Sequence, residues 1–276
     1  MNIENIINKL ESDIKNLNEW FINNGMKLNE DKCQFMLIES SHTIRNEKAK
    51  VKIADSTIEE IKKGKLLGIT FDKNLTMHDH IKHIYKQASN KLYALARISN
   101  VLSDQKRKIL MKSFVTSQFN YCPVIWMYCQ RKSNNMINKI HERALRIAHN
   151  DYISDFHALL EKDHSVTFHQ RNIQALTNEV YKTLNNLNPD IMKEVFTVKE
   201  NNYQTRKQYL VYPNPRTVRY GLESFGYKAS HIWSNLPKEM QQATNLNTFK
   251  RYNFKHTKTV CTCNICKPYI NNLGYI

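Results

Sequence analysis

The chain has 276 residues, of which 41% are hydrophobic, and a formal net charge of +16. This composition excludes a disordered tail and supplies enough apolar side chains for one large domain or two smaller ones. No stretch approaches the roughly 20 apolar residues that span a bilayer, and residues 1–15 lack the basic and apolar regions of a signal peptide. We therefore expect an intracellular protein of the nucleus or cytoplasm, with no membrane partner and with its cysteines reduced or bound to metal.

The positive charge is concentrated in one segment. Between His80 and Asn150 the sequence holds thirteen basic residues and two acidic ones, Asp104 and Glu142, which leaves +11. A solvated helical surface usually mixes both signs, so this segment predicts binding to nucleic-acid phosphates; a merely soluble helical surface is the alternative. The thirteen are Lys82, Lys86, Lys91, Arg97, Lys106, Arg107, Lys108, Lys112, Arg131, Lys132, Lys139, Arg143 and Arg146.

Residues 1–80 predict a small α+β piece. Apolar residues from Ile3 to Phe21 recur at helical spacing, and Gly25 suits the end of that helix. The apolar run 33–38 is expected to form a strand with 51–53 as its partner, and 65–72 to form a further strand closed by a turn at 72–74. So few strands make an incomplete sheet, whose apolar faces would be left partly uncovered.

From His80 onward the apolar period changes to that of a helix, which predicts a helical bundle. Ser103 and Ser133 are expected as N-caps, and Pro123 is expected to end or kink the helix before it. The whole chain is therefore expected to be mainly α, with an irregular C-terminal region. The expected helices cover 81–95, 103–119, 136–148, 156–160 and 173–187, with a short one near 244–252 after β-prone segments at 209–212 and 217–220.

Three cysteines form the most specific local pattern. Cys261, Cys263 and Cys266 follow the spacing C-x-C-x-x-C, and His256 is the nearest candidate for a fourth ligand. Thiolates on a tight turn can reach one zinc ion, which prefers four such ligands in a tetrahedron. The alternative is a cluster of reduced cysteines without metal.

No catalytic pattern is complete. The residue four positions after His141 is Leu145, so the zinc-protease pattern H-E-x-x-H is absent. His78 and His80 would point in different directions on a helix, and Asp79 between them suits a helix start. The sequence contains no adjacent pair of aspartates of the kind that hold Mg²⁺ in two-metal polymerases. We therefore expect no catalytic residue and no small-molecule substrate.

Eight blocks, in order along nearly the whole chain, resemble one family. They are 20–29 (WFINNGMKLN), 32–36 (KCQFM), 66–69 (LLGI) with Asp72, Leu75 and His80 after it, 117–126 (SQFNYCPVIW), 141–147 (HERALRI), 171–173 (RNI), 220–221 (YG) and 232–237 (IWSNLP). This series is similar to the reverse transcriptases of non-LTR retrotransposons, most closely those of the jockey kind and its relatives. An ordered series of blocks is more specific than any one of them.

The resemblance implies a division of the chain. Residues 1–78 would be the end of the palm, with a primer-grip-like hairpin at Leu67, Gly68 and Ile69; residues 79–190 a helical thumb; and residues 191–276 a C-terminal extension. In that family the catalytic aspartates and their Mg²⁺ ions precede the block at 20–29. The resemblance therefore implies a truncated RNA-directed DNA polymerase that has kept primer–template binding and lacks the catalytic aspartates.

The expected partner is RNA or an RNA–DNA hybrid, bound through backbone phosphates. Lys139, Arg143 and Arg146 share one helix face suited to such phosphates. Two other interpretations remain: a free-standing zinc-containing nucleic-acid-binding module, and an inactive, decayed element. The residues expected to contact phosphate are Lys106, Arg107, Arg131, Lys139, Arg143 and Arg146.

Overall fold

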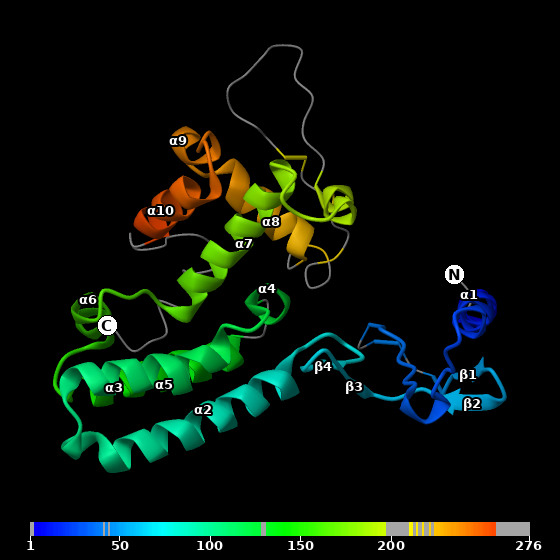
Figure 1. Ribbon diagram of the computed structural model, residues 1–276, viewed down its shortest axis with the longest axis horizontal. Coiled ribbons are helices and arrows are strands. Elements are labelled where there is room, and N and C mark those ends of the chain that lie inside the picture. Colours follow the sequence, from blue (N-terminus) through cyan, green and yellow to red (C-terminus); the bar gives the residue numbers. More distant parts are fainter. Residues whose placement is uncertain are drawn as a thin grey trace. The chain divides into compact units, whose positions relative to one another are not determined.

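The computed structural model describes residues 3–257, apart from residues 41 and 44 and segments 128–130, 197–209, 212–213, 215–216, 218–220 and 222–223. The chain divides into two compact units, Met1–His80 and Ile81–Ile276. Strands occur in the first of these and helices in both (Figure 1). The expected class, mainly α with a small α+β piece at the N-terminus, is confirmed.

The first unit consists of a helix and two separate β-hairpins. Helix α1 (Ile3–Asn23) packs against β1 (Lys50–Ile53), which pairs antiparallel with β2 (Ser56–Glu59). The second hairpin pairs β3 (Lys63–Leu66) with β4 (Ile69–Asp72). The small core of this unit contains Phe35, Ala49, Val51 and Ile53, with Ile7, Leu10 and Ile14 of α1 packed against it.

The apolar faces of this unit are partly uncovered, as expected. Leu17 and Trp20 of α1 are 49% and 54% exposed. A two-stranded sheet has too little surface to cover a helix of this length, so one side of the apolar stripe stays in contact with water.

Two strand predictions in this unit are wrong. The run 33–38 is not a strand; Phe35 makes an isolated bridge to Glu60, and β1 pairs instead with the segment that follows it. The run 65–72 is a hairpin rather than one strand, because Leu67 (φ +46°) and Gly68 (φ +87°) reverse the chain. Two successive left-handed residues form the tight turn that joins neighbouring antiparallel strands. The predicted turn after Asp72 is present, since Leu75 N donates to Asp72 O.

The second unit is a set of packed helices. In it α3 lies along α5, and α10 lies along α7 (Figure 1). The predicted helices are confirmed, and their ends differ by up to five residues when the π and 3₁₀ turns that follow α3, as far as Phe119, are counted with it. Helix α2 starts in the last residues of the first unit. The helices are α2 (His78–Ile98), α3 (Asp104–Leu110), α4 (Pro123–Trp126), α5 (Arg131–His149), α6 (Phe156–Lys162), α7 (Phe168–Leu184), α8 (Phe225–Ser234), α9 (Lys238–Gln241) and α10 (Leu246–Thr257).

The helix boundaries confirm the expected positions of Ser103 and Pro123 and correct that of Ser133. Ser103 occupies the N-cap position of α3, but Ser133 lies inside α5, which begins two residues earlier. Helix α3 continues through a π-helical turn, Met111–Val115, and a 3₁₀ turn, Thr116–Phe119. The chain then reverses at Cys122 (φ +43°), and Pro123 begins α4 rather than kinking a longer helix. Proline is favoured at a first helical position because its missing N–H would have no partner there.

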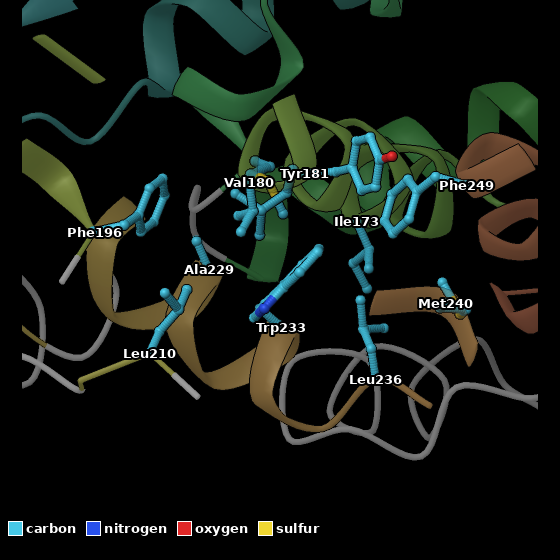
Figure 2. Packing of buried hydrophobic residues seen from close by; sticks show 12 residues of the cluster. Ile173, Val180, Tyr181, Phe196, Leu210, Ala229, Trp233, Leu236, Met240 and Phe249 are labelled. Carbon is cyan, nitrogen blue, oxygen red and sulfur yellow. The ribbon is translucent and has the colours of Figure 1, made fainter. Parts of the chain in front are cut away.

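The main core of the second unit joins its C-terminal helices to α7. Figure 2 shows Trp233 of α8 between residues of α7 and the C-terminal helices. Tyr181 stacks on Phe249 with ring centroids 4.4 Å apart, and its hydroxyl donates to Ala243 O at 2.8 Å. Residues 225–257 therefore share one core with α7, and the expected boundary at 190/191 falls inside this unit. The β-prone segments 209–212 and 217–220 lie mostly outside the described residues.

Candidate nucleic-acid interface

One face of α2 carries a line of exposed cations. Lys82, Lys86 and Arg97 are exposed, and so is Tyr93 between them. Intervals of four, seven and four residues keep these side chains on one side of a helix with 3.6 residues per turn. The opposite side of α2 is buried and packs into the unit through Ile81, Ile84, Ala88, Leu92 and Leu95. The amphipathic pattern that builds the helix therefore also places the cations in solvent.

One face of α5 carries the residues that the sequence singled out. Lys139 and Arg143 are exposed and lie one turn apart. Arg146 lies on the same face but is less accessible, with a side chain only 22% exposed, and its Nη2 is 2.7 Å from Glu142 Oε1. The buried side of α5 contains Ile137, Ile140, Ala144, Leu145 and Ala148.

These two faces meet at a single contact between the helices. The guanidinium carbon of Arg143 lies 5.5 Å from the ring centroid of Tyr93. We call the exposed side chains of both helices the α2–α5 face. It consists of Lys82, Lys86, Tyr93, Arg97, Lys139 and Arg143.

Both acidic residues of the segment are engaged elsewhere. Asp104 pairs with Arg107 of its own helix, and Glu142 pairs with Arg146. Within the described part of the chain, no ion pair involves Lys82, Lys86, Arg97, Lys139 or Arg143. The five cations of the α2–α5 face are therefore not neutralised by any ion pair with a described residue.

Arg107 has a different role from the one expected. Its side chain is only 10% exposed. Nη1 donates to Ser99 O at 3.2 Å and to Leu102 O at 2.7 Å, and Nε donates to Ala148 O at 3.4 Å. These bonds tie the turn between α2 and α3 to the end of α5. Four of the five N–H donors of this guanidinium are used inside the chain, the fourth by the ion pair of Nη2 with Asp104, and the side chain is buried, so Arg107 is a structural residue.

The remaining predicted phosphate contacts are placed less closely together. Lys106 is exposed on α3, next to the buried Arg107 in sequence. Arg131 begins α5, and its side chain lies outside what the structure describes. Neither is part of the α2–α5 face.

The hairpin expected to resemble a primer grip is in the first unit. Leu67 is 81% exposed and Leu66 64%, whereas Ile69 is buried. Leu67 has a positive φ, which a residue with a β-carbon adopts at a cost of about 1–2 kcal/mol. Lys65 of β3 is exposed beside this tip, whereas Lys63 lies at the other end of the hairpin, opposite Asp72, and pairs with Asp79. The tip is therefore an exposed, strained aliphatic turn with one lysine next to it.

Metal ligands do not gather in the described residues. No group of three His, Cys, Asp or Glu side chains there is arranged to hold an ion. Cys261, Cys263 and Cys266 lie outside the described residues, and His256 is exposed on α10. Asp79 forms an ion pair with Lys63, and His80 is buried. Zinc binding by the cysteine tail thus stays a prediction.

His141 is a core residue. It lies between the rings of Phe156 and Phe168, at centroid distances of 5.6 and 4.3 Å. Neither ring nitrogen has a hydrogen-bond partner among the described residues. Burial lowers the pKa of His141 to about 3, and the positive charge of Arg171 lowers it in the same direction. His141 is therefore neutral at physiological pH and packs as an aromatic side chain.

Sequence reasoning did not single out Tyr93 or the cations of α2. The spacing that places Lys82, Lys86, Tyr93 and Arg97 on one helix face was a usable signal. The contact of Tyr93 with Arg143 joins residues fifty positions apart, and no local pattern encodes it.

Within the described residues, no helix is both long enough and apolar enough to cross a membrane. Comparison with protein-family models, with curated proteins and with solved structures found no match to this chain.

Proposed function

We propose that this chain binds RNA or an RNA–DNA hybrid through backbone phosphates, as the thumb portion of a reverse transcriptase of the non-LTR retrotransposon kind. The cations of the α2–α5 face bind the phosphates in this proposal, and Lys106 adds to them. The chain itself contributes binding, and no catalytic residue is assigned to it.

The observation that carries the proposal is the unbalanced charge of the α2–α5 face. Five cations are exposed there, and the acidic residues of the same segment are paired with other arginines. Clustered lysine and arginine side chains of this kind bind phosphates and release counterions from the nucleic acid. The charge alone does not indicate a kind of enzyme; the ordered sequence blocks do, through their resemblance to reverse transcriptases.

The exposed hairpin tip is consistent with the same function. Leu67 carries two costs, an aliphatic side chain exposed to water and a left-handed backbone. Contact with a partner accounts for such a residue better than the fold does. In the family that the sequence resembles, this hairpin holds the primer end. Leu67 and its neighbour Leu66 would then contact sugar and base surfaces, with Lys65 on the phosphates.

The test is the salt dependence of binding. Affinity of the full chain for a labelled RNA–DNA hybrid is measured by fluorescence anisotropy at several salt concentrations. Each neutralised phosphate contributes a slope of about −0.7 to −0.9 in log K against log salt. The double variant Lys139→Gln with Arg143→Gln should therefore reduce the slope by about 1.4 to 1.8. Arg146→Gln should change it less, because Arg146 already pairs with Glu142.

A matched control separates the effect of the α2–α5 face on binding from the effect of the total charge of the chain. Lys48→Gln with Lys50→Gln also removes two positive charges, but both lysines pair with Glu59 in the other unit. This control should keep the wild-type slope. Equal effects of the two double variants would show that only net charge matters, and a wild-type chain with no measurable affinity would refute the proposal.

A further inference from the structure

An exposed tyrosine lies within the line of cations on α2. Tyr93 is 54% exposed, with Lys86 about 10 Å before it along the helix axis and Arg97 about 6 Å after it. Arg143 of α5 approaches the ring at 5.5 Å. An aromatic ring is therefore held in solvent between groups that bind phosphate.

We propose that Tyr93 and Arg143 form a stacking platform for an unpaired base, so that the α2–α5 face prefers a single-stranded segment over an uninterrupted duplex. This inference rests on the proposed function, because it assumes that the α2–α5 face binds nucleic acid. It adds the form of nucleic acid that the face selects and the residue that selects it.

The chemistry of the two partners supports this choice. Inside a duplex the faces of a base are covered by its neighbours, and only its edges and the backbone are accessible. An unpaired base presents its face, which stacks on tyrosine or on the plane of an arginine. A basic track interrupted by an exposed aromatic ring is the arrangement with which proteins bind single strands of any sequence.

The alternative role of Tyr93 is structural. A half-exposed ring buries little apolar area, and an exposed cation–π pair stabilises a fold only weakly. Tyr93→Leu should therefore leave the fold intact while removing the ring. Tyr93→Phe keeps the ring and removes only the hydroxyl, so it is the matched control.

The experiment compares two ligands of the same sequence. One is a labelled single-stranded RNA of about 12 nucleotides, a length within the site sizes of such surfaces, and the other is the same strand in an RNA–DNA hybrid. Tyr93→Leu in the full chain should weaken single-strand binding by about 5- to 150-fold, the range typical for loss of one base–aromatic stack. Hybrid binding should change by less than about twofold, since phosphate contacts remain, and Tyr93→Phe should bind both ligands like the wild type.

A second measurement uses the wild-type chain alone. A single strand in which abasic sites replace the central bases keeps its phosphates but has nothing to stack, so it should bind more weakly by a similar factor. Tyr93→Leu should not distinguish this strand from the complete one. Three results would each overturn the inference: Tyr93→Leu binds the single strand as tightly as the wild type, it loses as much affinity for the hybrid as for the single strand, or the wild type binds the abasic strand as tightly as the complete one. In each case a steep dependence of wild-type affinity on salt would still support the proposed function. Failure of the wild type to bind either ligand would overturn the proposed function itself.

Discussion

Arg107 provides the clearest test of how the fold uses its basic residues. The substitution is Arg107→Gln, and the comparison is Lys106→Gln at the adjacent position. Both remove one positive charge from α3, but the side chain of Lys106 is exposed and that of Arg107 is buried. Arg107→Gln should therefore lower stability, whereas Lys106→Gln should weaken hybrid binding.

The expected magnitude follows from the contacts of Arg107. Its bonds to Ser99 O and Leu102 O are 3.2 and 2.7 Å long, and a bond from a charged donor contributes about 1.5–3 kcal/mol. The third bond, to Ala148 O, is longer at 3.4 Å, and the ion-pair partner Asp104 is 75% exposed, so these two contacts add at most about 1 kcal/mol. Desolvation of the guanidinium in the folded state offsets part of the sum. We expect Arg107→Gln to lower the free energy of unfolding by about 2–4 kcal/mol.

The assay is urea denaturation of each variant followed by circular dichroism, with hybrid affinity measured in parallel. Arg107→Gln should move the midpoint to lower urea, whereas Lys106→Gln should keep stability within about 0.5 kcal/mol of wild type and weaken hybrid binding. If Arg107→Gln were as stable as wild type and lost affinity for the hybrid, the structural role assigned to Arg107 would be refuted.

Two further predictions concern stability in each unit. Because the pKa of His141 is lowered to about 3 in the fold, the unfolded chain takes up the proton first as pH falls below about 6.5. The free energy of unfolding should therefore drop by about 2 kcal/mol between pH 7 and pH 5. Denaturant titrations at both pH values should show a smaller drop for His141→Leu. In the first unit, Arg45 bridges Glu39 and Glu60 at 2.9 and 2.6 Å. Arg45→Met should destabilise this unit by about 3 kcal/mol at pH 7, measured by hydrogen exchange of β1. The deficit should be smaller at pH 4, because the hydrogen bonds of Arg45 lower the pKa values of Glu39 and Glu60 in the wild type, whereas the variant lacks them and its two carboxyl groups take up protons more readily. A pH-independent deficit would show that packing of the arginine, rather than its charge, is what matters.

The helices of the second unit were predictable because their apolar residues follow a 3.6-residue period that their burial confirms. Ile81, Ile84, Ala88, Leu92 and Leu95 repeat at this spacing and are all buried. A stripe of this kind specifies both the helix and the side that faces the core. Helix α8 was not predicted. Its segment is short and contains Gly226, and the role of its apolar residues is evident only from their packing on α7.

The strands of the first unit were predicted less well because short apolar runs do not specify a partner. Residues 33–38 are apolar because Phe35 packs against the β1 hairpin and Cys33 and Leu37 lie next to the same core, without a ladder of hydrogen bonds. The apolar pattern at 65–72 predicted one strand, since a leucine in a left-handed turn is uncommon and only the following glycine signalled a reversal; the hairpin was implied by the resemblance alone.

The sequence by itself determined the helical character of residues 81–184 and the excess of positive charge between His80 and Asn150, because period and composition are local properties. Only the tertiary structure decided which cations remain available. Arg107 bonds to Ala148 O at the end of α5, whereas Lys139 and Arg143 stay exposed and Arg143 meets Tyr93 of another helix. The reason is physical: whether a guanidinium faces a carbonyl, a carboxylate or water depends on what the rest of the fold places beside it.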